Sequence, residues 1–184
     1  MGVRLNRHII SVHSPKYVTR INKIDQNSKK FKRATSFKIY LTNPSLRSAL
    51  FSPLKKDDDF IGNMVETAIF SQWGHNTGFT PYYARWKNGE VDIVSLSNEK
   101  QKPLWAVEIK WSNRFVKSLQ KLSNLKSFCL KNKLDRTLVT TLDIEEIKED
   151  DGLTYDFTPS SIYCYTVGKN AIDRKISNPM TINH

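Results

Sequence analysis

The spacing of apolar residues changes several times along this chain of 184 residues, and each change predicts a new kind of element. From Phe60 to Trp73, apolar side chains recur every three or four residues, which predicts a helix. The stretches 80–86 and 90–96 are rich in β-forming residues, and Asn88-Gly89 between them is a strong hairpin signal. The middle of the chain therefore predicts a helix followed by a β-hairpin.

The N-terminal part predicts a second hairpin. Residues 17–24 and 37–41 alternate as strands do, with Val18 or Ile21 facing inward, and we expect the two strands to lie at the edge of the main domain. A short helix over 45–51 follows, because Asn43 or Thr42 can cap it and Pro44 suits its first turn.

The C-terminal part completes the predicted sheet. Residues 104–111 form an apolar strand that suits a central position, and a long helix to Asn132 follows, capped by Ser112 or Asn113. Two further strands are expected at 136–141 and 161–166, separated by an acidic loop at 143–151. The inner face of the long helix consists of Phe115, Leu119, Leu122, Leu125 and Cys129. This order predicts an α/β fold with a central mixed sheet flanked by helices.

The net charge is unevenly distributed. The chain has 29 Lys and Arg against 18 Asp and Glu, a formal charge of +11. Residues 1–35 hold nine of the bases and one acid, hence +8, which leaves +3 for the rest. We therefore separate a basic N-terminal segment, 1–35, from a domain over 36–184. A basic excess favours phosphate-bearing partners such as nucleic acid, with a solvated basic tail as the alternative.

Several classes of protein are disfavoured. No apolar run approaches the roughly 20 residues of a membrane-spanning helix, so no membrane association is expected. The four histidines lack the spacing of zinc ligands, and the two cysteines, Cys129 and Cys164, form no metal or disulfide motif. Reduced thiols are typical of a cytoplasmic protein.

A few charged residues fall on predicted strands. Glu108 and Lys110 project from one face of a strand that is otherwise apolar, where a charge needs a reason. Asp92 lies on the preceding strand and Glu66 on the upstream helix. If these elements pack together, the three acids converge beside Lys110. The alternatives are an exposed Glu108–Lys110 ion pair and a solvated Glu66.

Converging carboxylates call for a cation. Two of them about 4 Å apart repel by roughly 4 kcal/mol at an effective dielectric constant near 20. Oxygen ligands without His or Cys favour Mg²⁺ or Mn²⁺. Such an ion can polarise a phosphodiester, and Lys110 can orient or deprotonate a water or offset transition-state charge.

The set Glu66, Asp92 and Glu108-Ile109-Lys110 resembles the PD-(D/E)XK nuclease superfamily, with its restriction-endonuclease-like fold. The stretches 37–47, 62–66, 82–92 and 105–112 are similar to the C-terminal nuclease-like domain, long of unknown function, of prokaryotic AAA-type ATPases. The resemblance spans roughly residues 17–166. Those ATPases carry a P-loop, which this chain lacks, so it is either a free-standing relative or a fragment of a longer protein.

The resemblance implies roles for particular residues. It makes Asp92 and Glu108 metal ligands, Lys110 the catalytic lysine, and Glu66 the acid that completes the metal shell or binds a ligand water. It also suggests Glu90 as an auxiliary acid. Gln120 would be a supporting polar residue. The implied cofactor is Mg²⁺ or Mn²⁺.

The predicted long helix is basic, with six Lys and Arg and no acid between 112 and 134. Arg114, Lys117 and Lys121 share one face and could follow a phosphate backbone, although an ordinary polar helix face is the alternative. Two functions stay open. One is a metal-dependent nuclease acting on DNA. The other is a non-catalytic module that binds nucleic acid or docks a partner, such as an ATPase or a second copy of the chain.

Overall fold

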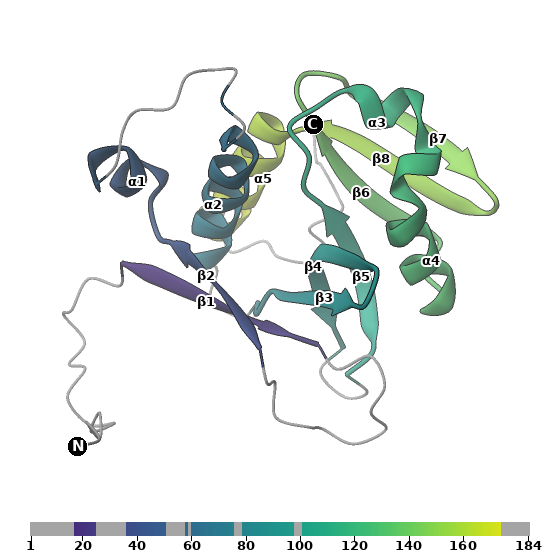
Figure 1. Cartoon of the computed structure of the whole chain (residues 1–184), viewed down its shortest axis with the longest axis horizontal. Helices are drawn as coiled ribbons and strands as arrows, with labels where there is room; N and C mark the ends of the chain where they lie inside the picture. The colour runs from purple at the N-terminus through teal and green to yellow at the C-terminus, as the bar shows by residue number, and fades with distance from the viewer. Residues whose placement is uncertain are drawn as a thin grey trace.

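The computed structural model describes residues 17–24, 36–50, 58, 60–75, 79–97 and 101–173. Its strands form one mixed sheet of eight, in the order β2-β1-β3-β4-β5-β6-β8-β7 (Figure 1). The strands are β1 (Val18–Lys23), β2 (Phe37–Leu41), β3 (Tyr82–Trp86), β4 (Gly89–Leu96), β5 (Pro103–Glu108), β6 (Arg136–Thr141), β7 (Glu146–Asp150) and β8 (Leu153–Pro159). β5 lies between antiparallel β4 and parallel β6, which confirms its central position.

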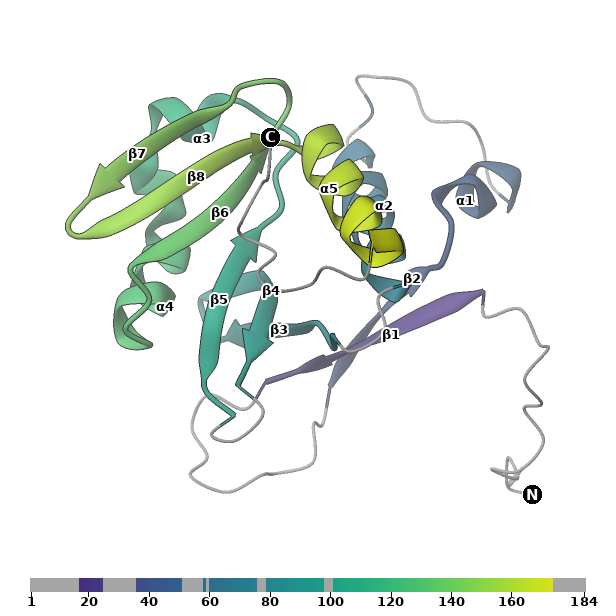
Figure 2. The same ribbon diagram turned by 180° about the vertical axis from the view of Figure 1, so that it is seen from behind.

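Helices cover the two faces of this sheet. They are α1 (Pro44–Leu50), α2 (Ile61–Gly74), α3 (Arg114–Lys117), the 3₁₀ helix η1 (Leu119–Leu122), α4 (Ser123–Lys131) and α5 (Ser160–Asp173). α2 and α5 lie side by side on one face, and α3 and α4 lie on the other (Figures 1 and 2). The predicted α/β class, with a mixed sheet flanked by helices, is confirmed.

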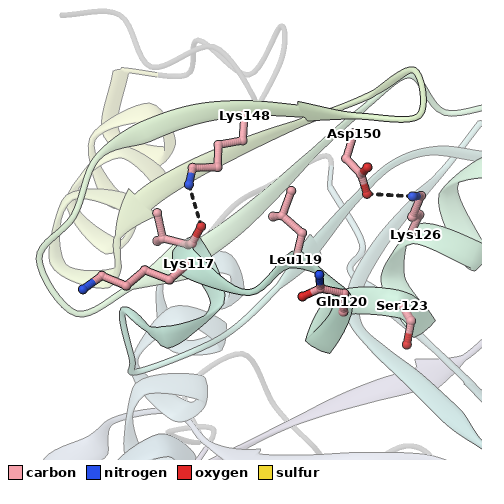
Figure 3. Close-up of a pocket in the computed structure, with 8 residues that line it drawn as sticks. Lys117, Leu119, Gln120, Ser123, Lys126, Lys148 and Asp150 are labelled. Atoms are coloured by element: carbon pink, nitrogen blue, oxygen red, sulfur yellow. Dashed lines mark hydrogen bonds and ion pairs between the residues drawn. The ribbon is translucent and has the colours of Figure 1, made fainter.

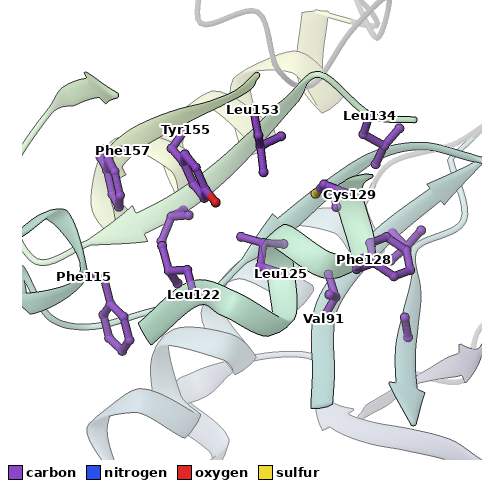
Figure 4. Packing of buried hydrophobic residues seen from close by; sticks show 14 of the residues in the cluster. Val91, Phe115, Leu122, Leu125, Phe128, Cys129, Leu134, Leu153, Tyr155 and Phe157 are labelled. Atoms are coloured by element: carbon purple, nitrogen blue, oxygen red, sulfur yellow. The ribbon is translucent and has the colours of Figure 1, made fainter. Parts of the chain in front are cut away.

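Each face has its own hydrophobic core. On the α4 side, Leu125 and Cys129 pack with Tyr155 and Phe157 of β8 (Figure 4). On the other side, Ile69, Phe70 and Trp73 of α2 pack against Val107 and Tyr163. Because both cores rest on the same strands, β6 and β8 are almost wholly buried, and β4 and β5 are buried in their middle residues.

Both predicted hairpins are present. β1 pairs antiparallel with β2 at the edge of the sheet, with Ile21 buried and Val18 exposed. This strand of the basic segment 1–35 also pairs with β3, so it belongs to the sheet. The second hairpin joins Trp86 to Gly89, where a Cβ on the glycine would lie 2.5 Å from the Trp86 ring. Only glycine fits there.

The predicted cap of α1 is present, whereas Asn113, which precedes α3, makes no side-chain cap hydrogen bond. The Ser45 amide donates to Asn43 Oδ1 over 2.8 Å, which is the expected cap of α1. Cys129 and Cys164 form no disulfide. None of the helices in the described part of the chain has the length and apolar character needed to cross a membrane.

The predicted single helix over 112–132 is wrong. The backbone leaves the helical region at Ser118, with φ −138° and ψ 78°, so α3, η1 and α4 replace one helix. The break lets α3 and α4 each turn its own apolar residues to the core, Phe115 and Val116 from α3 and Leu125 and Cys129 from α4.

Two predictions near the C-terminus are also wrong. The acidic loop at 143–151 contains β7, which pairs with β8 through a tight turn at Asp151-Gly152. Both turn residues have positive φ, 48° and 73°, as this kind of hairpin requires. The strand expected at 161–166 is part of α5. Its β-branched and aromatic residues favour a strand, but Tyr163 and Val167, four residues apart, form a buried helical face.

Candidate functional site

The candidate site lies where β5 ends, at the segment 109–113 that leads into α3. β5 stops at Glu108, three residues before the predicted end at Trp111. At this point the Ile109 amide donates a hydrogen bond to Asp92 Oδ2 of β4, over 2.8 Å. The Asp92 carboxylate thus holds the chain as it leaves the sheet, and its side chain is only 8% exposed.

A β-bulge positions Asp92 on β4. Ala84 of β3 pairs with Val91, and Tyr82 pairs with Val94, so β4 carries one more residue than β3 over this stretch. The extra residue re-aims the side chains beside it, which is a common use of bulges near functional sites. Asp92 and Ile93 are the two residues within the bulge.

Lys110 joins the two acids of the strands. Its Nζ donates to Glu108 Oε1 over 2.6 Å and lies 4.0 Å from Asp92 Oδ2. Its main chain is held by Thr140, whose hydroxyl accepts from the Lys110 amide and donates to the Lys110 carbonyl. Lys110 is therefore held both through its backbone and through its side chain.

Glu66 approaches the same place from α2. Tyr40 of β2 donates its hydroxyl hydrogen to Glu66 Oε2 over 2.8 Å, and the Tyr40 ring stacks on Phe70. Burial raises the pKa of Glu66, and the charge of Asp92 raises it further, so the two carboxylates lie within electrostatic range of each other. Asp92, Glu108 and Lys110 are linked by ion pairs, and Glu66 joins them at longer range.

The sequence analysis missed two residues of this cluster, Lys38 and Tyr40. Both come from β2, and their spacing of two puts them on the same face of the strand. Lys38 Nζ forms an ion pair with Glu90 Oε1 and lies 3.7 Å from Asp92 Oδ1. Lys38 could have been identified from the sequence as a lysine flanked by apolar residues on a predicted strand. The same signal singled out Lys110.

Burial and mutual repulsion raise the pKa of the acids. Loss of solvent raises the pKa of Asp92 and of Glu66, and the charge of Asp92 adds to the effect at Glu66. Loss of solvent, and then the Asp92 charge, raise the pKa of Glu108 to about 8. At Lys110, burial alone lowers the pKa, but Glu108 and Asp92 outweigh it and raise the pKa above its usual value. Lys110 is therefore a cation at neutral pH.

The donor set fits a hard divalent cation in its chemistry. Carboxyl groups from Glu66, Glu90, Asp92 and Glu108 gather around two lysines, and the pKa of Glu108, raised to about 8, shows how strongly the metal-free cluster disfavours a further negative charge. Glu108 Oε2 is buried and has no hydrogen-bond partner. Carboxylate oxygens are the ligands that Mg²⁺ and Mn²⁺ prefer.

The present arrangement of the side chains is not yet a metal cage. Within the described ranges, no three His, Cys, Asp or Glu side chains form a group that could hold a metal ion as they stand. Instead, Lys110 holds Glu108 and Lys38 holds Glu90, with Asp92 between the two ammonium groups. The two lysines therefore supply the positive charge that the acids require.

Two residues with weaker predicted roles lie in different places. Glu90 belongs to the cluster through its ion pair with Lys38. Gln120 instead lines a surface pocket of about 580 Å³ beside η1, α4 and β7, together with Lys126 and Lys148 (Figure 3). No hydrogen bond joins Gln120 to the acids within the described part of the chain.

The predicted nucleic-acid contacts are exposed but do not share one helix. Arg114, Lys117 and Lys121 are all exposed, the first two on α3 and the third on η1. Arg114 and Lys110 both lie against the Phe115 ring, at 4.8 and 5.6 Å from its centre, so Arg114 is beside the candidate site. Lys117 borders the pocket next to β7 (Figure 3).

Comparisons with known proteins identify no relative of this chain. No protein-family model matches the chain, and no curated protein or solved structure matches it either. The function is therefore inferred from the residues of this chain and from their arrangement.

Proposed function

We propose that this protein is a metal-dependent nuclease that cleaves DNA phosphodiester bonds, related to the PD-(D/E)XK superfamily. The observation that carries the proposal is the meeting of Asp92, Glu108 and Lys110 at the end of β5, within an acidic and largely buried cluster. Such a charged group in a central strand is costly to fold unless its members are paired or used. We place its action in the cytoplasm, where its cysteines stay reduced.

Mg²⁺ or Mn²⁺ would be held by Asp92, Glu108 and Glu66. When bound, the ion would supply Lewis-acid stabilisation of the negative charge that develops on a phosphodiester. Glu108 Oε2 is the ligand oxygen with no competing partner. Tyr40 orients Glu66 through its hydrogen bond, and the Ile109 amide orients Asp92.

Lys110 would act as a cation rather than as a base. Its pKa is raised by Glu108 and Asp92, so the proton stays on Nζ at neutral pH. A protonated ammonium can donate a hydrogen bond to an attacking water or to a phosphate oxygen and offset the developing charge. Arg114, which lies against the same aromatic ring, would contact the neighbouring phosphate.

The direct test is cleavage of single-stranded, duplex and branched DNA with Mg²⁺ or Mn²⁺. We expect Asp92→Ala and Lys110→Ala each to lower the rate by about a hundredfold or more, because each removes a group that stabilises the transition state. Glu149→Ala and Lys131→Ala, which change exposed residues of β7 and α4, are the controls and should leave the rate unchanged. Cleavage that survives both site substitutions would contradict the proposal.

One observation favours a second function, a non-catalytic module that binds nucleic acid or docks a protein such as an ATPase. The acids are already paired with lysines, so they can stabilise the fold without a metal. Calorimetric titration with Mn²⁺ separates the two functions. Binding that is lost in Asp92→Asn supports the nuclease, whereas the module predicts no such site.

A further inference from the structure

β2 carries a second lysine into the acidic cluster. Lys38 projects from the same face of β2 as Tyr40, which is the face that α2 covers. Its side chain is 21% exposed. Its Nζ pairs with Glu90, lies 3.7 Å from Asp92 Oδ1, and sits 5.2 Å from the centre of the Tyr83 ring. Lys38 is thus paired with two acids, Glu90 and Asp92, and lies near an aromatic ring.

The two lysines divide the oxygens of Asp92 between them. Lys38 faces Oδ1, whereas Lys110, at 4.0 Å, faces Oδ2, which also accepts the Ile109 amide. Any cation bound by Asp92 must therefore approach an oxygen that already faces an ammonium group. At such distances, like charges repel by several kcal/mol at an effective dielectric constant near 20.

Lys38 is the more easily displaced of the two. Each lysine is also bound to a second acid, Lys110 to Glu108 and Lys38 to Glu90. The Lys110 backbone is anchored to Thr140, whereas Lys38 stands on the outermost strand of the sheet. Asp92 Oδ2 also accepts the Ile109 amide, so Oδ1 is the oxygen that can be freed by moving one side chain.

We propose that Lys38 is an internal counter-ion that competes with a divalent cation for Asp92 and leaves that carboxylate when the cation binds. Lys38 is here a positioning residue, because it acts through Asp92 and Glu90. The inference rests on the proposed metal-dependent function. Its consequence is that removing the Lys38 charge strengthens metal binding, whereas removing a side chain that supports the site would weaken it.

Calorimetric titration of the DNA-free protein with Mn²⁺ at pH 8 tests this. Lys38→Met should bind Mn²⁺ about tenfold more tightly than the wild type, and Lys38→Arg, which keeps the charge, should stay within about twofold of it. Lys131→Met, an exposed lysine on α4, is the matched control and should not change the affinity. Circular dichroism confirms that each variant is folded.

A measurement on the wild type covers the case in which Lys38→Met does not fold. In a Mg²⁺ titration followed by NMR of the lysine side-chain NH₃⁺ groups, the Lys38 signal should shift with the midpoint of metal binding, and the Lys131 signal should not. Equal or weaker Mn²⁺ binding by folded Lys38→Met overturns the inference, as does a Lys38 signal that Mg²⁺ leaves in place. If the affinity rises as expected but no DNA is cleaved, the proposed nuclease activity fails while the role of Lys38 stands.

Discussion

At the scale of single residues, the cluster gains its properties from burial. Glu108 is 12% exposed, shares its surroundings with Asp92, and keeps one oxygen without a hydrogen-bond partner. A carboxylate in that position gives up its proton reluctantly, and its pKa is raised to about 8. A raised pKa in the folded chain is also a statement about stability.

The metal-free wild type should therefore lose stability relative to Glu108→Gln as the pH rises from about 5 to 8. Between 4.5, the pKa of an ordinary Glu, and about 8, the folded chain holds a proton at Glu108 that the unfolded chain releases. The more protonated state is disfavoured as pH rises, so the difference should grow by up to about 1.4 kcal/mol per pH unit.

Urea unfolding in EDTA at several pH values measures this difference. Glu149→Gln removes an exposed acid from β7 and serves as the control, with a pH dependence like that of the wild type. A Glu108→Gln variant whose stability follows the wild type at every pH would show that Glu108 is ionised in the fold throughout this range.

At the scale of elements, short sequence signals proved reliable where they fix backbone geometry. Asn88-Gly89 predicts the β3–β4 hairpin, and Asn43 caps α1 as expected. Asp151-Gly152 is a signal of the same kind, which the acidic residues around it obscured. β7 tolerates those acids because it is an edge strand, where the side chains remain in contact with water.

Gly152→Ala should lower the free energy of unfolding by about 1 kcal/mol. Gly152 has φ of 73° in the β7–β8 turn, a conformation that a Cβ makes costly, although no atom lies within 4 Å of the added methyl group. Gly62→Ala is the matched control. A Cβ added at Gly62 also meets nothing within 4 Å, but Gly62 lies in the helix α2. That change should be neutral or stabilising by up to about 0.5 kcal/mol, since alanine favours helices.

Urea unfolding of both variants gives the comparison. Opposite or clearly different effects in two equally open positions would assign the cost to the backbone and not to packing. An equal effect of the two substitutions would contradict the positive φ at Gly152.

At the scale of the whole molecule, three exposed bases follow the acidic cluster along the chain. The cluster lies at the end of β5, and Arg114, Lys117 and Lys121 are exposed on the segment that leaves it. A bound DNA strand would therefore meet its positive contacts outside the acidic cluster, beginning at Arg114 beside Lys110. Most basic residues of segment 1–35 lie outside the described residues, and their role stays a prediction.

Replacing Arg114, Lys117 and Lys121 together by Ala should weaken DNA binding and its dependence on salt. The slope of log affinity against log salt concentration should fall by about 0.9 for each phosphate that the variant no longer binds. Fluorescence anisotropy with labelled duplex DNA at several NaCl concentrations measures that slope. The control replaces Lys87, Lys131 and Lys169 by Ala, three lysines that are exposed elsewhere on the molecule. It has the same net charge as the first variant and should keep a steeper slope than that variant. Equal slopes in the two variants would mean that only net charge matters.

The sequence by itself determined the α/β class, the central position of β5 and both predicted hairpins, because local periodicity and turn residues act over a few positions. It also singled out Glu66, Asp92, Glu108 and Lys110, since charges on apolar elements stand out. It misjudged 112–132 and 161–166, where the buried face depends on what the other elements offer. The end of β5 at Glu108 was likewise set from outside, by Asp92 of β4.

Only the tertiary structure decided how the site is composed. Tyr40 and Glu66 are distant in the sequence and meet because α2 packs against β2. The pairing of Lys38 with Glu90, and the approach of both lysines to Asp92, depend on strand order, on the bulge in β4 and on burial. Electrostatic energies depend on distances and solvent exposure, which no pattern of residues along a chain specifies.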